Sequence, residues 1–568
     1  MRYAALAVDF DGTLAHDGQV NEATAAALLR LRASGRRLVL VTGRELPDLL
    51  TACPDVPLFD LVVAENGGLL YWPATGEQRP LAAPPPDALI IALEARGVAP
   101  ISRGRVVVAT WQPHEAAVLD AIQEVGLEHQ LIFNKGAVMV LPPSVNKGSG
   151  LLAALGHLRL SPHNIVAIGD AENDHAMFAV AECAVAVANA LPMVKERADL
   201  VTTGDHGAGV IEIADRMTTG DLEAVPPPAR HRIALGAAPS GAAVLLPAYG
   251  GSILIAGSSG SGKSTILAGL AERLGERGYQ GCLVDPEGDY DGLTHAVILG
   301  SWQHAPAIPE VIRVLDDPGE SVVVNLLGVP LTERPAYVAR LRAALHEYRG
   351  RLGRPHWIAL DEAHHALPRW GEGPLPALFA QLGQIMLVTV DPEHLAPEAL
   401  ARIDVVVATG EAPAAIVRAF CAAVSEPSPD GLDGPLPPGV ALVWRRGERR
   451  ATHVVTLPPR FPHRRHRRKY AEGELTPERS FRFRGPTGEV DLRASSLQQF
   501  VAMTATVDDA VWCYHLRRGD FARWFRDVIR DDALAGEATR GEALLAGAIG
   551  ESRAIIRRAI ERRYTLPA

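Results

Sequence analysis

Short apolar runs alternate with longer amphipathic stretches in the first part of the chain. The runs "YAALAVDF", "RLVLVTG" and "NIVAIGD" are apolar without strict alternation, whereas "NEATAAALLRLRASG" has the spacing of a helix with one apolar face. Such runs, separated by amphipathic helices, are typical of parallel strands that are buried on both faces. The pattern therefore predicts an α/β domain with a Rossmann-like parallel sheet over residues 1–217.

A polar, proline-rich stretch at 218–231 ends this series and predicts a linker. A second α/β series follows over 232–460, with apolar runs that include "GGSILIAG", "SVVVNLLG" and "RPHWIALDE". Its last part, "VALVWRRGERRATHVVTLPP", has the pattern of a hairpin. After a basic linker at 461–469, residues 470–568 predict a short strand pair followed by helices. We therefore expect three folded units, the last being a small, mostly helical accessory domain.

Charge and cysteine usage narrow the class of protein. The formal net charge of −10 argues against a protein whose main role is to coat nucleic acid or an anionic membrane. The basic run "HRRHRRK" is the exception, and it is either a solvated linker or a phosphate-binding patch. The cysteines form no CxxC spacing, and the chain has no leader-like start and no apolar segment of roughly 18 residues. These features predict a cytoplasmic protein with no membrane partner.

Two carboxylates follow the first apolar run directly. "AVDFDGTL" places Asp9 and Asp11 at the expected carboxyl edge of a parallel sheet, where α/β proteins bind ligands. Two negative charges on one turn repel each other unless a divalent cation lies between them, and Mg²⁺ prefers such oxygens together with a substrate phosphate. One carboxylate can then attack phosphorus while the other moves the proton.

The same series supplies the other groups that phosphoryl chemistry needs. "VLVTGR" provides the hydroxyl of Thr42, and "NKGSGLLAAL" provides Lys147 at the start of a helix. "AIGDAENDHAMF" provides Asp170 and Asp174 after another strand. A single DxD pair is a weak signal, but these groups together predict a Mg²⁺-dependent phosphate site.

These residues, in this order, resemble the haloacid dehalogenase (HAD) superfamily, in its Cof-like, sucrose-phosphatase-like and archaeal phosphoglycolate-phosphatase-like branch. The resemblance covers residues 1–217. It implies Asp9 as the nucleophile that forms an aspartyl-phosphate and Asp11 as general acid and then base, the mark of a phosphatase. It implies Mg²⁺ held by Asp9, the Asp11 main-chain carbonyl and Asp170, with Asp174 in support. It assigns phosphate binding to Thr42, Gly43, Lys147 and Asn173.

The segment at about 80–141 lies where this branch inserts a cap, and "ENGG" at 65–68 also matches the branch. A cap excludes water and selects the substrate. Its short length suggests a small phosphorylated metabolite, of the sugar phosphate or phosphoglycolate class.

A second phosphate motif, "GSSGSGKST", lies between the apolar run "SILIA" and a predicted helix, which is the context that a P-loop requires. Lys263 is expected to reach the outer phosphates of ATP and Ser264 to bind Mg²⁺. "HWIALDEAHH" supplies Asp361 for the metal and Glu362 to polarise the attacking water. The residues expected to bind nucleotide are Gly257, Ser258, Ser259, Gly260, Ser261, Gly262, Lys263, Ser264 and Thr265.

With "LVDPEGDY" and "LVTVDPEHLAPEALARIDVVVATG", the second series resembles HerA/FtsK-type ATPases over about 232–458. The resemblance implies ATP hydrolysis, assembly into a homo-oligomer and translocation of DNA or protein. Val390 and Asp391 depart from the polar sensor and arginine expected there, which counts against an efficient ring motor. "DEAH" is also found in helicases, but other helicase motifs are not evident.

We therefore predict a phosphatase of a small phosphorylated metabolite fused to an ATP-binding and hydrolysing domain, with Mg²⁺ and ATP as cofactors. One alternative is a nucleic-acid processing or translocating ATPase with an attached end-trimming phosphatase. A second alternative is a phosphatase that nucleotide binding regulates.

Overall fold

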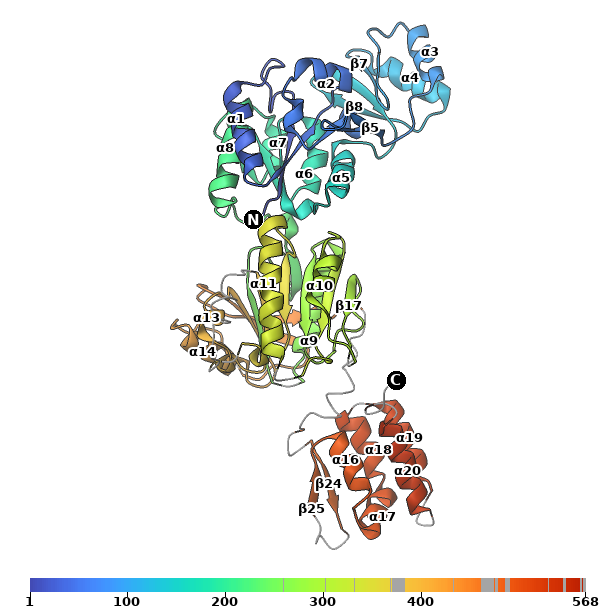
Figure 1. Cartoon of the computed structure of the whole chain (residues 1–568), viewed down its shortest axis with the longest axis vertical. Helices are drawn as coiled ribbons and strands as arrows, with labels where there is room; N and C mark the ends of the chain where they lie inside the picture. Colours follow the sequence, from blue (N-terminus) through green and yellow to red (C-terminus); the bar gives the residue numbers. More distant parts are fainter. Residues whose placement is uncertain are drawn as a thin grey trace. The chain divides into compact units, whose positions relative to one another are not determined.

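The structure is a computed structural model, shown in Figure 1. It describes all residues except 259, 302, 331–332, 368, 370–383, 433, 461–474, 476–478, 486–490, 530, 545–547, 562–563 and 565–568. The chain divides into two compact units: Met1–Pro286 together with Leu293–Phe461, and Glu287–Gly292 together with Pro462–Ala568. Among the described helices, none has both the length and the apolar composition that crossing a bilayer requires.

The first sheet of unit one contains eight strands, and its central strands are parallel, as the apolar runs predict. β1 pairs in parallel with β2 and with β10, and all of its residues are buried, as is typical of a central parallel strand. The strand order is β12-β11-β10-β1-β2-β3-β4-β5. The strands are β1 (Ala5–Asp9), β2 (Arg37–Val41), β3 (Leu61–Ala64), β4 (Leu69–Trp72), β5 (Glu77–Pro80), β10 (Ile165–Gly169), β11 (Cys183–Ala186) and β12 (Leu200–Val201).

Helices cover this sheet, and α1 packs against α8 while α5 packs against α6 (Figure 1). The start of α5 is encoded locally, because Asn146 and Ser149 form a reciprocal capping box directly around Lys147. The helices are α1 (Glu22–Ala33), α2 (Leu46–Ala52), α5 (Lys147–Leu158), α6 (His175–Val180), α7 (Pro192–Arg197) and α8 (His206–Gly220). Leu222 and Val225, within the predicted linker, are buried in the same core, so this core extends beyond residue 217.

A small separate sheet is inserted between β5 and α5, within the segment predicted as the cap. Its strand order is β6-β7-β9-β8, and α3 and α4 pack on it around a core of their own. The elements are α3 (Asp87–Ala95), β6 (Ser102–Arg103), β7 (Val108–Trp111), α4 (Glu115–Val125), β8 (Gln130–Asn134) and β9 (Ala137–Leu141).

The second sheet of unit one contains eleven strands. Its order is β14-β13-β23-β22-β21-β15-β20-β19-β16-β18-β17, and the predicted hairpin is present as the antiparallel pair β22 and β23. The strands are β13 (Ile233–Ala237), β14 (Ala243–Leu246), β15 (Ile253–Gly257), β16 (Gly281–Asp285), β17 (Ala296–Leu299), β18 (Ser321–Asn325), β19 (Trp357–Leu360), β20 (Ile385–Thr389), β21 (Val405–Thr409), β22 (Val440–Arg445) and β23 (Thr452–Thr456). The helices are α9 (Lys263–Glu276), α10 (Ile308–Leu315), α11 (Arg334–Leu352), α13 (Pro397–Leu400) and α14 (Pro413–Ala423).

The two α/β segments of unit one meet at the edges where their strands begin. Asn164, just before β10, donates from Nδ2 to the carbonyl of Gly353 at 3.1 Å and contacts His356 Nε2 through Oδ1 at 3.0 Å. Glu182, just before β11, accepts from the Tyr279 hydroxyl, two residues before β16, at 2.8 Å. Because the beginnings of the strands meet, the carboxyl ends of the two sheets point away from each other.

Unit two contains a strand pair and helices, as its sequence predicts. β24 and β25 are antiparallel, and the large aromatic residues of the segment form its core instead of a surface site. The elements are β24 (Phe481–Arg484), β25 (Asp491–Ala494), α16 (Leu497–Thr504), α17 (Asp509–Arg518), α18 (Asp520–Trp524), α19 (Asp532–Glu542) and α20 (Ile549–Ile560). The predicted basic linker at 461–469 lies outside the described residues.

Candidate active site

The ends of three neighbouring strands bring the predicted carboxylates and hydroxyl together. Asp9 is the last residue of β1, Thr42 follows β2 on one side and Asp170 follows β10 on the other. Carboxylate oxygens of Asp9, Asp170 and Asp174 all lie within 4.8 Å of one another, and all three residues are buried. The parallel register of the sheet is therefore what assembles this edge.

Lys147 lies between two of these carboxylates. Its Nζ donates to Asp9 Oδ1 at 2.5 Å and to Asp174 Oδ1 at 2.6 Å, and its side chain is only 1% exposed. Burial alone would lower the pKa of Lys147, but the two carboxylates raise it, so the ammonium stays charged. The pKa of Asp9 is nevertheless raised well above its usual value, first by burial and then by the neighbouring Asp174. The site therefore has more buried negative charge than one lysine balances.

Asp174 and Asp170 are held by groups of the fold. Asp174 Oδ2 accepts from the backbone N–H groups of Asp170 at 2.8 Å and Ala171 at 2.9 Å, which fixes the turn after β10. Asp170 Oδ1 accepts from the Thr13 hydroxyl at 3.1 Å. Each carboxylate thus accepts hydrogen bonds from the surrounding fold through one oxygen. The other oxygen accepts from a lysine, which is Lys147 for Asp174 and Lys135 for Asp170.

Lys135 also contacts the active-site carboxylates, although no sequence motif indicates it. It lies in the cap, in the turn between β8 and β9. Its Nζ donates to Asp170 Oδ2 at 2.7 Å and to the Asp11 main-chain carbonyl at 3.0 Å. These are two of the oxygens that the HAD resemblance assigns to Mg²⁺. A cation already occupies the position, and all the surrounding ligands are hard oxygens, so the residues fit a Mg²⁺ ion.

The Asp11 carboxylate is turned toward Arg44. Arg44 Nε and Nη2 donate to Asp11 Oδ2 and Oδ1 at 2.8 and 2.7 Å, a bidentate pair, and Nη1 donates to Asp48 at 2.9 Å. The hydrogen bonds to Asp11 raise the pKa of Arg44. Asp11 is about one-third exposed, so its carboxylate can exchange Arg44 for a substrate group without crossing a packed core.

Amide groups converge beside Thr42 and Gly43. Asn173 Nδ2 donates to Asn66 Oδ1 at 3.0 Å, but Asn66 Nδ2 and Asn173 Oδ1 are buried with no hydrogen-bond partner among the described residues. A side chain added at Gly43 would point toward the amides of Asn134 and Asn173. Buried donors without partners are rare in folded proteins, so Asn66 Nδ2 is a candidate donor to a phosphate oxygen.

The "ENGG" stretch connects this centre to the cap. Glu65 is buried, and its carboxylate accepts from the backbone N–H groups of Arg105, Val106 and Val107 at 2.9, 2.7 and 3.2 Å. Glu65 and Asn66 both have positive φ, at 51° and 53°. The stretch therefore holds the start of a cap strand and aims Asn66 at the site, two roles that its sequence alone does not indicate.

Comparison with known proteins assigns this domain. The sequence profile of haloacid dehalogenase-like hydrolases matches residues 6–79 and 116–213. A phosphoglycolate phosphatase of Haloarcula marismortui is 35% identical over 216 residues, which cover 36% of this chain and 94% of that protein. The chain belongs to the haloacid dehalogenase-like hydrolase family. A phosphoglycolate phosphatase of Methanothermobacter thermautotrophicus is 32% identical over 221 residues, 37% of this chain and 97% of that protein. A solved structure of a haloacid dehalogenase-like hydrolase from Bacteroides thetaiotaomicron is 18% identical, with a TM-score of 0.34. The match covers 38% of this chain and 99% of the chain in that structure.

The second predicted phosphate motif lies outside the HAD domain, at the carboxyl end of β15. Gly257 ends the strand, Gly262 adopts φ 97° at the helix N-cap, and Lys263, Ser264 and Thr265 open α9. Ser258, Gly260 and Ser261 form the turn between them, and Ser259 lies outside the described residues. Lys263 Nζ donates to the Ser258 carbonyl at 3.3 Å. The described residues of the motif thus lie between a strand and a helix, the context that the sequence predicts.

Asp361, the predicted acidic partner, follows β19 and lies beside this motif. In the sheet, β20 stands between β19 and β15, the strand that leads into the motif. Ser264 Oγ donates to Asp361 Oδ2 at 3.4 Å, and Asp361 Oδ1 accepts from the Glu362 N–H at 2.9 Å. Glu362 has a positive φ of 43°, and its carboxylate lies 3.6 Å from His364 Nδ1. Asp391, at the expected sensor position, accepts from the Glu393 N–H at 2.8 Å as the cap of a short helix.

Proposed function

We propose that the HAD domain hydrolyses the phosphoric monoester of a small metabolite with the help of Mg²⁺. The observation that carries this proposal is the buried Asp9–Lys147–Asp174 group at the end of β1, with Asp170 beside it. Relatives that this chain covers over 94% and 97% of their length are named phosphoglycolate phosphatases, which supports the same reaction class. Bound Mg²⁺, held by Asp9, Asp170 and the Asp11 carbonyl, would supply positive charge that offsets repulsion between Asp9 and the phosphate.

The residues of the chain divide the reaction between them. An Asp9 oxygen forms a bond to phosphorus as the ester P–O bond breaks, and Asp11 gives its proton to the leaving oxygen. Water then attacks phosphorus, Asp11 takes the proton of the water, and phosphate leaves with Asp9 restored. Lys147, Thr42 and Asn66 donate to the phosphoryl oxygens, where negative charge accumulates. Asp11 has to leave Arg44 for each of its two proton transfers.

The cations around the site favour an acidic substrate of the phosphoglycolate class over a neutral sugar phosphate. Lys135, from the cap, is 44% exposed and bonds to the Asp11 carbonyl and Asp170, and Arg44 bonds to the Asp11 carboxylate. A Mg²⁺ ion held by these oxygens would take the place of the Lys135 ammonium, which would leave Lys135 free to pair with a substrate carboxylate. Lys135→Met should therefore lower kcat/KM for phosphoglycolate while leaving kcat/KM for a hexose phosphate within about threefold.

The test of the reaction compares Asp9→Asn with Asp17→Asn on a panel of phosphate esters with and without Mg²⁺. Asp17 lies on the same loop but is exposed, so its variant controls for changes of charge. Asp9→Asn should lose several orders of magnitude of turnover, because no other group can take over covalent catalysis. Turnover of Asp9→Asn within tenfold of the wild type would overturn the assignment.

As a second function, we propose that residues 232–460 bind and hydrolyse ATP. The observation in favour is that Ser264 and Asp361, the two residues expected to hold Mg²⁺, are 3.4 Å apart next to the Lys263 turn. Lys263→Ala should abolish ATP binding, and Glu362→Gln should bind ATP without hydrolysing it, because one group holds phosphate and the other orients water. Glu398→Gln, an exposed glutamate on α13, is the matched control. Normal hydrolysis by Glu362→Gln would contradict the pairing.

The same assay separates the alternatives for how the two functions combine. Stimulation of ATP hydrolysis by DNA would favour a translocating ATPase in a homo-oligomer, whereas a change in phosphatase turnover on adding ATP would favour nucleotide regulation. Because the carboxyl ends of the two sheets point away from each other, residues 232–460 are expected to supply no catalytic group to Asp9. A cytoplasmic location stays a prediction of the sequence.

A further inference from the structure

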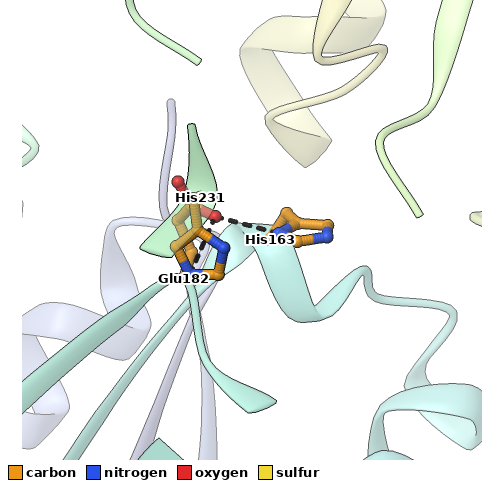
Figure 2. Close-up of side chains that lie close together, drawn as sticks. All are labelled: His163, Glu182 and His231. Carbon is orange, nitrogen blue, oxygen red and sulfur yellow. Dashed lines mark hydrogen bonds and ion pairs between the residues drawn. The ribbon is translucent and has the colours of Figure 1, made fainter. Parts of the chain in front are cut away.

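Two histidines and a glutamate come together on the edge of the HAD domain that faces away from Asp9. His163 lies in the short helix η3 (Pro162–Asn164), Glu182 precedes β11, and His231 ends the short helix η5 (Ala229–His231). Figure 2 shows the three side chains converging. One ligand atom from each lies within 4.8 Å of the other two, and His163 and Glu182 are buried while His231 is half-buried.

Each imidazole presents one ring nitrogen to Glu182, and His163 also holds a backbone carbonyl with its other ring nitrogen. His163 Nε2 lies 2.7 Å from the Arg277 carbonyl, and a carbonyl only accepts, so Nε2 carries the proton. His163 Nδ1 lies 2.9 Å from Glu182 Oε2. His231 Nε2 is buried without a hydrogen-bond partner among the described residues and lies 3.7 Å from Glu182 Oε2. A ring N–H held by a carbonyl is the arrangement that orients metal-binding histidines.

Two further side chains contact the Glu182 carboxylate. The Tyr279 hydroxyl donates to Glu182 Oε2 at 2.8 Å and orients it. Arg2 lies 3.4 Å from the other oxygen, Oε1, and opposes a cation.

We propose that His163 Nδ1, Glu182 Oε2 and His231 Nε2 bind a Zn²⁺ ion. Two imidazoles and one carboxylate suit Zn²⁺ better than Mg²⁺, which prefers oxygen ligands only. The ion has a structural role, because the cluster lies at the amino edge of the sheet and the catalytic carboxylates lie at the carboxyl edge. It ties the stretch before His231 to the HAD domain, directly beside Arg277 and Tyr279 of the second α/β segment.

The test uses the full chain, stripped with a chelator and then kept in excess Mg²⁺ so that the Asp9 site is occupied. Zn²⁺ is titrated in competition with a chromophoric chelator, and Co²⁺ is used as a spectroscopic probe. The wild type should bind one equivalent of Zn²⁺ and give the strong visible absorption of four- or five-coordinate Co²⁺ with nitrogen ligands. His231→Gln should lose that equivalent and the absorption, and Tyr279→Phe, which removes only the orienting hydroxyl, should weaken Zn²⁺ binding by about 10- to 100-fold.

His346→Gln is the matched control, because His346 is an exposed histidine on α11 outside the cluster, and this variant should bind Zn²⁺ like the wild type. Circular dichroism of the metal-free variants checks that each one folds. If His231→Gln does not fold, the comparison of Tyr279→Phe with the wild type decides. The proposal is overturned if the wild type binds no Zn²⁺ in excess Mg²⁺, in which case the cluster is only a set of hydrogen-bonded side chains. It is also overturned if folded His231→Gln binds Zn²⁺ as tightly as the wild type.

Discussion

Lys147→Met tests whether the buried lysine is the countercharge on which the active-site edge depends. The ammonium is 1% exposed and bonds to Asp9 and Asp174, which are themselves buried. Removing one partner of a buried ion pair costs about 3–5 kcal/mol, because the other charge is left without compensation. For a domain of about 150–250 residues, 1 kcal/mol shifts the melting temperature by about 2–4 °C, so a loss of about 4 kcal/mol lowers Tm by about 8–16 °C.

Lys135→Met is the matched control, since Lys135 also bonds to an active-site aspartate but is 44% exposed. Pairs that solvent screens contribute about 0.2–1 kcal/mol, so this variant should lose at most about 4 °C. The assay is differential scanning calorimetry of the full chain in EDTA, so that no divalent ion compensates for the missing lysine. Equal shifts for the two variants, or a loss of less than about 2 °C in Lys147→Met, would refute the reasoning.

The difference should also depend on pH in a definite direction. The folded-state pKa of Asp9 lies above its unfolded value, so its contribution to stability is fully present below the unfolded pKa of about 3.9 and is lost as the pH rises through the folded pKa. Lys147 lowers the pKa of Asp9, so removing Lys147 enlarges this loss at neutral pH. The Tm difference between Lys147→Met and the wild type should therefore be largest near pH 7 and shrink toward pH 4. A difference that is constant across this range would contradict the assignment of charge.

Three further predictions concern the frame around the site. Glu65→Ala leaves three cap N–H groups without their acceptor and should cost about 3 kcal/mol or more in urea unfolding, whereas the exposed Glu77→Ala should cost less than about 0.5 kcal/mol. Gly67→Ala should abolish phosphatase turnover, because Gly67 has φ 105° and an added Cβ would lie 2.0 Å from the carbonyl oxygen of Asn146, the residue before Lys147. Retained turnover would show that the backbone can move to make room for the Cβ. A fragment of residues 1–231 should hydrolyse the same esters as the full chain, whereas one ending at residue 220 should be less stable, because it lacks buried Leu222 and Val225 and the Asp221–Arg36 ion pair; equal melting temperatures of the two fragments would contradict this.

Local sequence patterns were enough to predict the helices and strands and the parts of the candidate sites that lie at their ends. Asp9, Lys147 and Gly257 could be placed because each lies directly at the end of an apolar run or the start of a helix, and such runs and caps are encoded by neighbouring residues. Parallel strands bring their carboxyl ends to one edge whatever lies between them, so the meeting of Asp9 with Asp170 also followed from the pattern.

Contacts between residues far apart in the chain could not be predicted from those local patterns. Lys135 reaches Asp170, and Glu65 holds the cap, through contacts that depend on how a separate sheet docks on the first one. His163, Glu182 and His231 come from three segments with no common motif, and their approach depends on the stretch at 218–231 folding back onto the HAD domain. The physical reason is that hydrophobic periodicity and capping act over a few residues, whereas these contacts arise from the packing of whole elements whose register no local pattern specifies.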